Sequence, residues 1–182
     1  FSSTNVLLAG TNVWKYHAEW LDLGSAWRAP EYDDRLWLSG AALFYAPVSG
    51  IVFPFAKNTL LPLANSSGTR ILTFYFRTQF AFDGDTNGLL LALRGIFDDG
   101  AVFYLNGTEV ARYNMPTGAV TAATLALNDL DATNLVLLSL DRAAFVPGNN
   151  VLAVELHQSS TNSGDVAFGL SLAAQVRSAT AL

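Results

Sequence analysis

The side chains best suited to hold a polar ligand lie in two short segments of this 182-residue chain. His157 and Gln158 end an apolar run and precede a polar stretch that contains Asp165, and Asp98 and Asp99 form an acidic pair. Imidazole, amide and carboxylate are planar hydrogen-bonding groups of the kind that hold a hydroxyl-rich ligand, such as a sugar, at the rim of a domain. In the alternative interpretation His157 binds the backbone of the neighbouring loop and the acidic pair accepts turn amides.

A flat aromatic side chain would supply the other half of sugar recognition, because a pyranose ring stacks on an apolar platform. Trp20 and Trp27 flank a short stretch around Asp22 that is typical of a loop. We expect one of the two, with Trp27 as the first candidate, to be exposed within reach of His157 or Asp98. The alternative is that both indoles are buried.

A candidate cation site lies in residues 83–88. Asp83, Asp85 and Asn87 place oxygen ligands at alternate positions, as in the first half of a calcium loop. The acid expected at the twelfth position is missing, since Arg94 stands there. The segment therefore predicts either a structural calcium site or an ordinary polar hairpin loop, and no other cofactor is expected.

Catalytic activity is not expected. A serine triad needs a nucleophile, a base and an orienting acid, and no serine lies in a Gly-x-Ser-x-Gly elbow. Asp98 and Asp99 do not form a glycosidase pair, which needs two carboxyl groups facing one bond, ~5 to 9.5 Å apart. The chain has no cysteine, which excludes disulfides, thiolate zinc sites and thiol catalysis.

The charge of the chain limits its partners. Its net charge is −5 at pH 7, so nucleic acid is not an expected partner, because phosphate binding needs a basic face. No apolar run reaches the ~18 residues of a membrane helix, so membrane insertion is not expected. Charged residues make up 14% of the chain, against ~25% in an average soluble domain. So few charges indicate either a surface that is covered by something else or a setting in which solubility is supplied by other means.

The first ten residues offer one way to cover such a surface. Edge strands usually carry charges, lysine above all, that prevent pairing with other chains. Asn5, Val6, Leu7 and Leu8 form an uncharged segment. This segment is a candidate strand for donation to a neighbouring copy, in which case residues 1–10 would leave their own domain.

Alternation with a period of two predicts strands along the chain, because successive side chains of a strand point to opposite faces. Asn106-Gly107 favours a tight turn, so residues 101–105 and 108–113 are expected to form a hairpin. No segment shows a helical period with caps. Many short strands with regular turns indicate an antiparallel sandwich or barrel. The other expected strands cover residues 72–82, 89–93, 135–140, 151–156 and 168–177.

Two segments carry a resemblance to a known family. They are Asp98 to Arg112, followed by Asn114-Met115-Pro116, and Gly148 to Gln158. Over most of its length the chain resembles the galactose-binding-like, carbohydrate-binding-module-like jelly-roll domains of bacterial extracellular proteins. The resemblance implies an all-β fold, an antiparallel two-sheet β-sandwich of jelly-roll type, with residues 1–182 as a single domain. It also implies a non-catalytic module, often glycan-binding, that works outside the cell or at its surface.

Two functions from different classes follow. The leading hypothesis is a non-catalytic extracellular glycan-binding accessory module, whose partner is a polysaccharide or other glycan. The alternative is a self-assembling structural subunit of an extracellular fibre, sheet or surface layer, which binds copies of itself through charge-poor faces or strand donation. A domain that only packs against a catalytic neighbour is a third interpretation. The glycan-binding candidates are Trp27, Asp98, Asp99, His157, Gln158 and Asp165.

Overall fold

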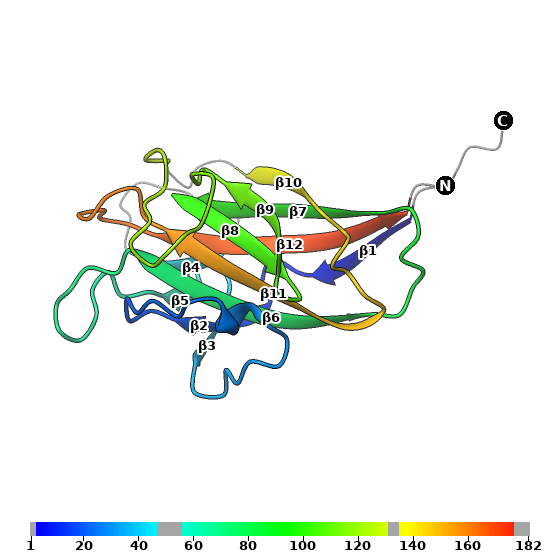
Figure 1. The fold of residues 1–182 in the computed structure, drawn as a ribbon, viewed down its shortest axis with the longest axis horizontal. Coiled ribbons are helices and arrows are strands. Elements are labelled where there is room, and N and C mark those ends of the chain that lie inside the picture. The colour runs from blue at the N-terminus through cyan, green and yellow to red at the C-terminus, as the bar shows by residue number, and fades with distance from the viewer. Residues whose placement is uncertain (1–2, 47–55, 131–134, 177–182) are drawn as a thin grey trace.

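A computed structural model describes residues 3–46, 56–130 and 135–176 and shows two β-sheets packed face to face (Figure 1). The strands are β1 (Ser3–Leu8), β2 (Val13–His17), β3 (Leu38–Ala41), β4 (Phe44–Tyr45), β5 (Thr59–Leu60), β6 (Thr73–Phe82), β7 (Leu89–Asp98), β8 (Gly100–Leu105), β9 (Thr108–Tyr113), β10 (Val136–Leu140), β11 (Gly148–His157) and β12 (Ala167–Val176). The first sheet has the order β10-β7-β12-β4-β5, with β1 also paired to β12, and the second has the order β3-β2-β6-β11-β8-β9. The predicted antiparallel two-sheet β-sandwich is therefore confirmed.

Helical structure is minor in the part of the chain that the structure describes. It consists of a single 3₁₀ turn, η1 (Ala26–Arg28). Among the described residues there is accordingly no helix with the length and apolar character needed to span a bilayer.

The two sheets enclose an inner apolar layer. Strand β6 contributes Phe74, Phe76 and Phe80 to it, at the alternate positions that a period of two predicts. Phe168 of β12 stacks on Phe76 with ring centroids 4.0 Å apart, which joins the second sheet to the first. Trp14 of β2 packs edge-on against the same Phe168 at 5.2 Å.

Two of the long strands, β7 and β11, extend beyond the apolar runs that predicted them. Strand β7 continues to Asp98, five residues past the expected end, and β11 begins at Gly148. Strand β7 pairs with β12 over ten positions, from Leu89 opposite Val176 to Asp98 opposite Ala167. This pairing carries the strand through Arg94 and Gly95, which interrupt the apolar pattern.

The Asn106-Gly107 hairpin between β8 and β9 is confirmed. Asn106 has a φ of 49° and Gly107 a φ of 87°, the positive values that this tight turn requires. The Asn106 amide group also donates to the carbonyl oxygen of Ala144 at 2.8 Å, and its Oδ1 accepts from the backbone N–H of Val151 at 2.8 Å. The turn is thus fixed to β11 as well as closing its own hairpin.

The central strands of the second sheet, β6, β11 and β8, are largely buried on both faces. The inner face of this sheet meets the first sheet, and its outer face is covered by residues 18–37, which include η1, and by residues 114–130 (Figure 1). These loops form an outer cluster with side chains that point away from the inner layer of the sandwich. Its buried members are Trp27, Trp37, Tyr75, Val102, Tyr104, Met115, Ala126 and Ala153.

In this structure residues 3–8 stay in their own domain, and donation of this segment to a neighbouring copy stays a prediction. Strand β1 pairs antiparallel with β12 of the same chain, from Ser3 opposite Val176 to Leu8 opposite Leu172. Asn5 and Val6 lie in this ladder, and Leu7 sits at a register shift between Val6 and Leu8. Leu8 is buried in the inner layer and Leu7 packs against it. These contacts retain the segment in its own sheet.

Candidate functional site

Most of the residues predicted to bind a ligand are buried beneath the covering loops. The prediction of an exposed Trp27 is wrong, because its indole N–H donates to Gly24 O at 3.1 Å and its ring packs edge-on against Tyr75. A buried side chain has no face on which a sugar can stack. The buried candidates are Trp27, Asp98, Asp99, His157 and Gln158, whereas Asp165 is half-buried.

His157 joins the end of β11 to a distant loop. Its Nδ1 lies 2.8 Å from the carbonyl oxygen of Thr124 and 2.9 Å from Thr73 Oγ1, and that hydroxyl donates to Ala122 O at 2.8 Å. A carbonyl oxygen can only accept, so Nδ1 carries a hydrogen. His157 and Thr73 therefore hold residues 122–124 against the sheet. This supports the structural interpretation of the imidazole, although the segment it holds is not the adjoining 159–165 loop.

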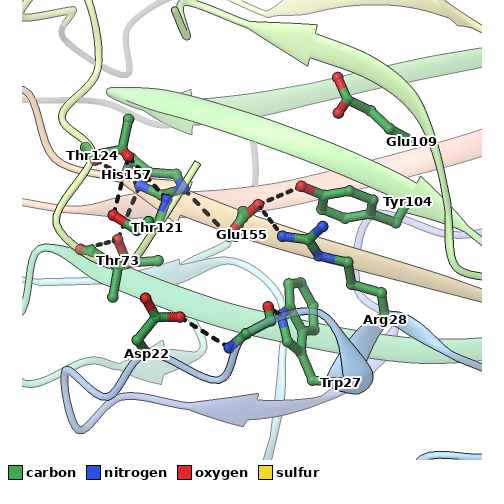
Figure 2. A network of polar contacts seen from close by, with 12 residues as sticks. Asp22, Trp27, Arg28, Thr73, Tyr104, Glu109, Thr121, Thr124, Glu155 and His157 are labelled. Carbon is green, nitrogen blue, oxygen red and sulfur yellow. Dashed lines mark hydrogen bonds and ion pairs between the residues drawn. The ribbon is translucent and has the colours of Figure 1, made fainter. Parts of the chain in front are cut away.

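Glu155, which sequence reasoning did not single out, is the centre of a buried polar network (Figure 2). Its Oε1 accepts hydrogen bonds from the Tyr104 hydroxyl and from Arg28 Nη2 at 3.3 Å, and its Oε2 lies 3.6 Å from His157 Nε2. The Arg28 guanidinium also lies 4.1 Å from the centroid of the Tyr104 ring. Burial, followed by the Glu155 carboxylate, raises the pKa of Tyr104, so its hydroxyl stays protonated and donates.

A second buried cation holds the N-terminal covering loop on the sheet. Arg77 of β6 donates from Nε to Asp34 Oδ2 at 2.8 Å, and from Nη1 to the carbonyl oxygens of Trp27 and Ala29. The alternation in residues 72–82 places Arg77 on the outer face of the second sheet. No local signal indicates that a loop some fifty residues earlier covers that face.

The two carboxyl groups of the acidic pair, Asp98 and Asp99, have different surroundings. Asp99 accepts the backbone N–H of Leu130 at Oδ1 (2.8 Å) and that of Ser159 at Oδ2 (2.7 Å), as the turn-amide interpretation proposes. Asp98 lacks such donors at its buried Oδ2. Burial first, and then the neighbouring carboxylates of Asp165 and Asp99, raise the pKa of Asp98 to about 9. Asp98 is therefore a protonated acid at neutral pH.

The Gln158 side chain holds the loop that follows it. Its Nε2 donates to the backbone oxygen of Asp165 at 2.7 Å, and the carboxylate of Asp165 acts in turn on Asp98. The structure thus brings together Asp98, Asp99, Gln158 and Asp165, of which the first three are buried and Asp165 is half-buried.

The 83–88 loop satisfies its own polar groups. Asp85 Oδ1 accepts the backbone N–H of Asn87 at 2.9 Å and the Asn87 side-chain amide at 2.8 Å, and Asp83 is exposed. Within residues 3–46, 56–130 and 135–176, no group of three or more His, Asp or Glu side chains has the arrangement of a metal site. The bonds within the loop favour the ordinary hairpin interpretation, while a calcium ion here stays a prediction.

An exposed indole does occur in the expected loop, but it is Trp20 rather than Trp27. Trp20 is 36% exposed and has a φ of 47°. It lies in a shallow depression of about 260 Å³ whose other wall is the segment that Thr73 and His157 hold against the sheet. The depression is lined by Trp20, Asp22, Thr121, Ala122 and Ala123.

A neighbouring depression of about 300 Å³ offers a different surface. Its rim is aliphatic, with Leu36 99% exposed, and its Trp37 is buried. Burial lowers the pKa of His17 within it, against the opposing effect of the Glu19 carboxylate. Because it presents no exposed indole, this depression is the weaker candidate for stacking a sugar.

No protein-family model matches the chain, and no curated protein matches its sequence. Solved structures do match. A β-glycosidase from Bacteroides vulgatus has a TM-score of 0.52 at 11% identity over 93% of this chain. A β-glucuronidase from Bacteroides uniformis reaches 0.54 at 15% over 96%, and one from Ruminococcus gnavus in complex with D-glucuronic acid reaches 0.54 at 14% over 96%.

This likeness shows that the chain shares a β-sandwich fold with part of each of these chains, which fits the predicted resemblance to galactose-binding-like domains. At such low identity it shows the fold alone. The chain corresponds to only 20%, 18% and 30% of those three chains, in the same order.

Proposed function

We propose that the chain is a non-catalytic, glycan-binding accessory module of a larger carbohydrate-active protein. The observation that carries the proposal is the match of nearly the whole chain to a minor part of β-glycosidase and β-glucuronidase chains. The matched region is so small that most of each enzyme chain consists of other domains. The extracellular location that the family resemblance implies belongs to the same proposal.

The positions of the ionisable side chains support a non-catalytic role. Glu155 and His157 are buried within the network that fixes the covering loops, and Asp98 is buried beside Asp99. Two carboxyl groups that hydrolyse a glycoside must both reach the scissile bond. These buried acids support the fold instead.

We expect the 182-residue chain to be retarded in native gels that contain a soluble polysaccharide and to release no p-nitrophenol from aryl β-glucosides or β-glucuronides. A panel of neutral and acidic polysaccharides, with bovine albumin as the mobility reference, provides the measurement. If no polysaccharide retards the chain, glycan binding is wrong. Hydrolysis that follows the chain through purification would instead contradict the non-catalytic role.

Self-association is a second candidate function, favoured by the outer face of the first sheet. Val6, Leu90 and Leu137 are exposed there, and the edge strand β10 carries no charge. Under this alternative the chain should associate as its concentration rises in sedimentation velocity, and Leu137→Lys should keep it monomeric. A wild-type chain that stays monomeric at all concentrations would contradict this alternative.

A further inference from the structure

We propose that Trp20, Asp22 and residues 121–123 form a subsite for one neutral pyranose ring. This inference rests on the proposed glycan-binding function and adds to it a place and a class of sugar. It replaces the buried Trp27 with an indole that a ligand can reach.

Trp20 is held toward solvent in an unfavourable backbone conformation. It follows the end of β2 and adopts a φ of 47°, in the left-handed region that bulky side chains rarely occupy. Such a conformation persists only where the surrounding structure imposes it, and it is found preferentially at sites that bind ligands. The other tryptophans, Trp14, Trp27 and Trp37, are at most 8% exposed. Trp20 is therefore the indole available for stacking.

Hydrogen-bonding groups lie next to this aromatic platform. Asp22 Oδ1 accepts the backbone N–H of Gly24 at 2.9 Å, which orients the carboxylate before any ligand arrives. Thr121 lies on the wall opposite Trp20, and its hydroxyl is 3.4 Å from Thr124 Oγ1 in the same segment. A carboxylate and a hydroxyl beside an indole supply the acceptors and the donor that sugar hydroxyl groups need.

The wall opposite Trp20 is fixed in advance of binding. The carbonyl oxygen of Ala122 accepts from Thr73, and that of Thr124 accepts from His157, both within the buried side of the segment. A wall anchored in this way loses little conformational entropy when a ligand binds. The small side chains of Ala122 and Ala123 keep the depression open, and a volume of about 260 Å³ suits one ring rather than several.

The charges of the lining select the class of sugar. Asp22 is the single ionisable side chain among the five lining residues, and no cation accompanies it. The carboxylate of a uronic acid would meet this like charge without a counter-ion, which disfavours binding. The subsite should therefore take neutral hexose units and reject uronates.

The test measures binding of the intact chain to neutral and acidic polysaccharides, with xyloglucan, galactomannan and polygalacturonate as the probes, by affinity electrophoresis. We expect Trp20→Ala to weaken binding of the neutral probe about tenfold or more, since a central aromatic anchor carries much of the affinity. Trp20→Phe, which keeps an aromatic face, should retain most of it. Asp22→Asn should raise the relative binding of polygalacturonate. Leu36→Ala, in the neighbouring depression, is the matched control and should bind as the wild type does.

A second measurement on the wild type avoids dependence on the folding of Trp20→Ala. Because the other indoles are buried, quenching by acrylamide reports mainly on Trp20, and the bound neutral polysaccharide should protect it. If the wild type binds but Trp20 is neither protected nor needed, the subsite is wrong and the proposed function stands. If the wild type binds none of the probes, the proposed function fails together with the subsite.

Discussion

Glu155→Gln is expected to lower the free energy of unfolding by about 3 kcal/mol, or roughly 6 to 12 °C in Tm for a domain of this size. The substitution removes the charge opposite Arg28, whose side chain is only 19% exposed. The amide oxygen of a glutamine can still accept the Tyr104 hydroxyl, so the loss lies in the ion pair with Arg28. Removing one partner of a largely buried ion pair leaves the other charge uncompensated. Thermal and urea unfolding, followed by circular dichroism, measure the change.

The matched control is an ion pair of better geometry at the surface. Arg35 Nη2 lies 2.7 Å from Asp33 Oδ2, closer than Arg28 lies to Glu155, but both side chains are mostly exposed. Exposed pairs contribute little to stability because water and salt screen them. Asp33→Asn should therefore change Tm by no more than a few degrees. Equal losses in the two variants would contradict the assignment of the larger effect to burial.

The fold could be predicted from the sequence because its signals are local. Alternating phenylalanines in residues 72–82 fixed the inner face of β6, and Asn106-Gly107 fixed a hairpin through a backbone requirement of two adjacent residues. The C-terminal end of β7 could not be found in this way. Its pairing with β12 depends on a strand some seventy residues later, and no property of Arg94 or Gly95 reports that partner.

The candidate site was less predictable because its residues face covering loops. A strand with one solvent-exposed face typically alternates polar and apolar residues. Strand β11 does so, because Glu155 and His157 alternate with apolar residues. The residues that cover this face are distant in the sequence, since Thr124 lies 33 positions from His157 and Arg28 lies 127 positions from Glu155. Polar residues on a solvated face and polar residues paired beneath a loop have the same local pattern.

The choice between Trp20 and Trp27 failed for a related reason. Both lie in the loop that follows β2, and composition does not distinguish them. The η1 turn directs Trp27 into the outer cluster, whereas the positive φ of Trp20 directs its side chain to the surface. A signal for the difference was present in part, since Gly24 and Ser25 before Trp27 favour a turn in the chain at that point.

Asp98→Asn is expected to change the stability by almost nothing at pH 4 and to stabilise the domain increasingly as the pH rises toward 8, by about 1.4 kcal/mol per pH unit. Burial, then Asp165 and Asp99, raise the pKa of Asp98 from 3.8 to about 9. Between these values the folded chain binds this proton and the unfolded chain releases it. The stability that protonated Asp98 contributes is therefore complete below pH 4 and is lost as the pH rises toward 9. Asparagine keeps the size of the side chain and removes this dependence.

Urea unfolding of both chains at pH 4, 6, 8 and 9 checks the expectation through the difference between the two profiles. Asp83→Asn, an exposed carboxylate in the 83–88 loop, is the control and should change the stability little at any of these values. If the Asp98→Asn and wild-type profiles stay parallel, Asp98 keeps its charge in the folded state. A charge there would face the Asp165 and Asp99 carboxylates with no hydrogen bond at Oδ2, so parallel profiles would require a counter-ion at this position.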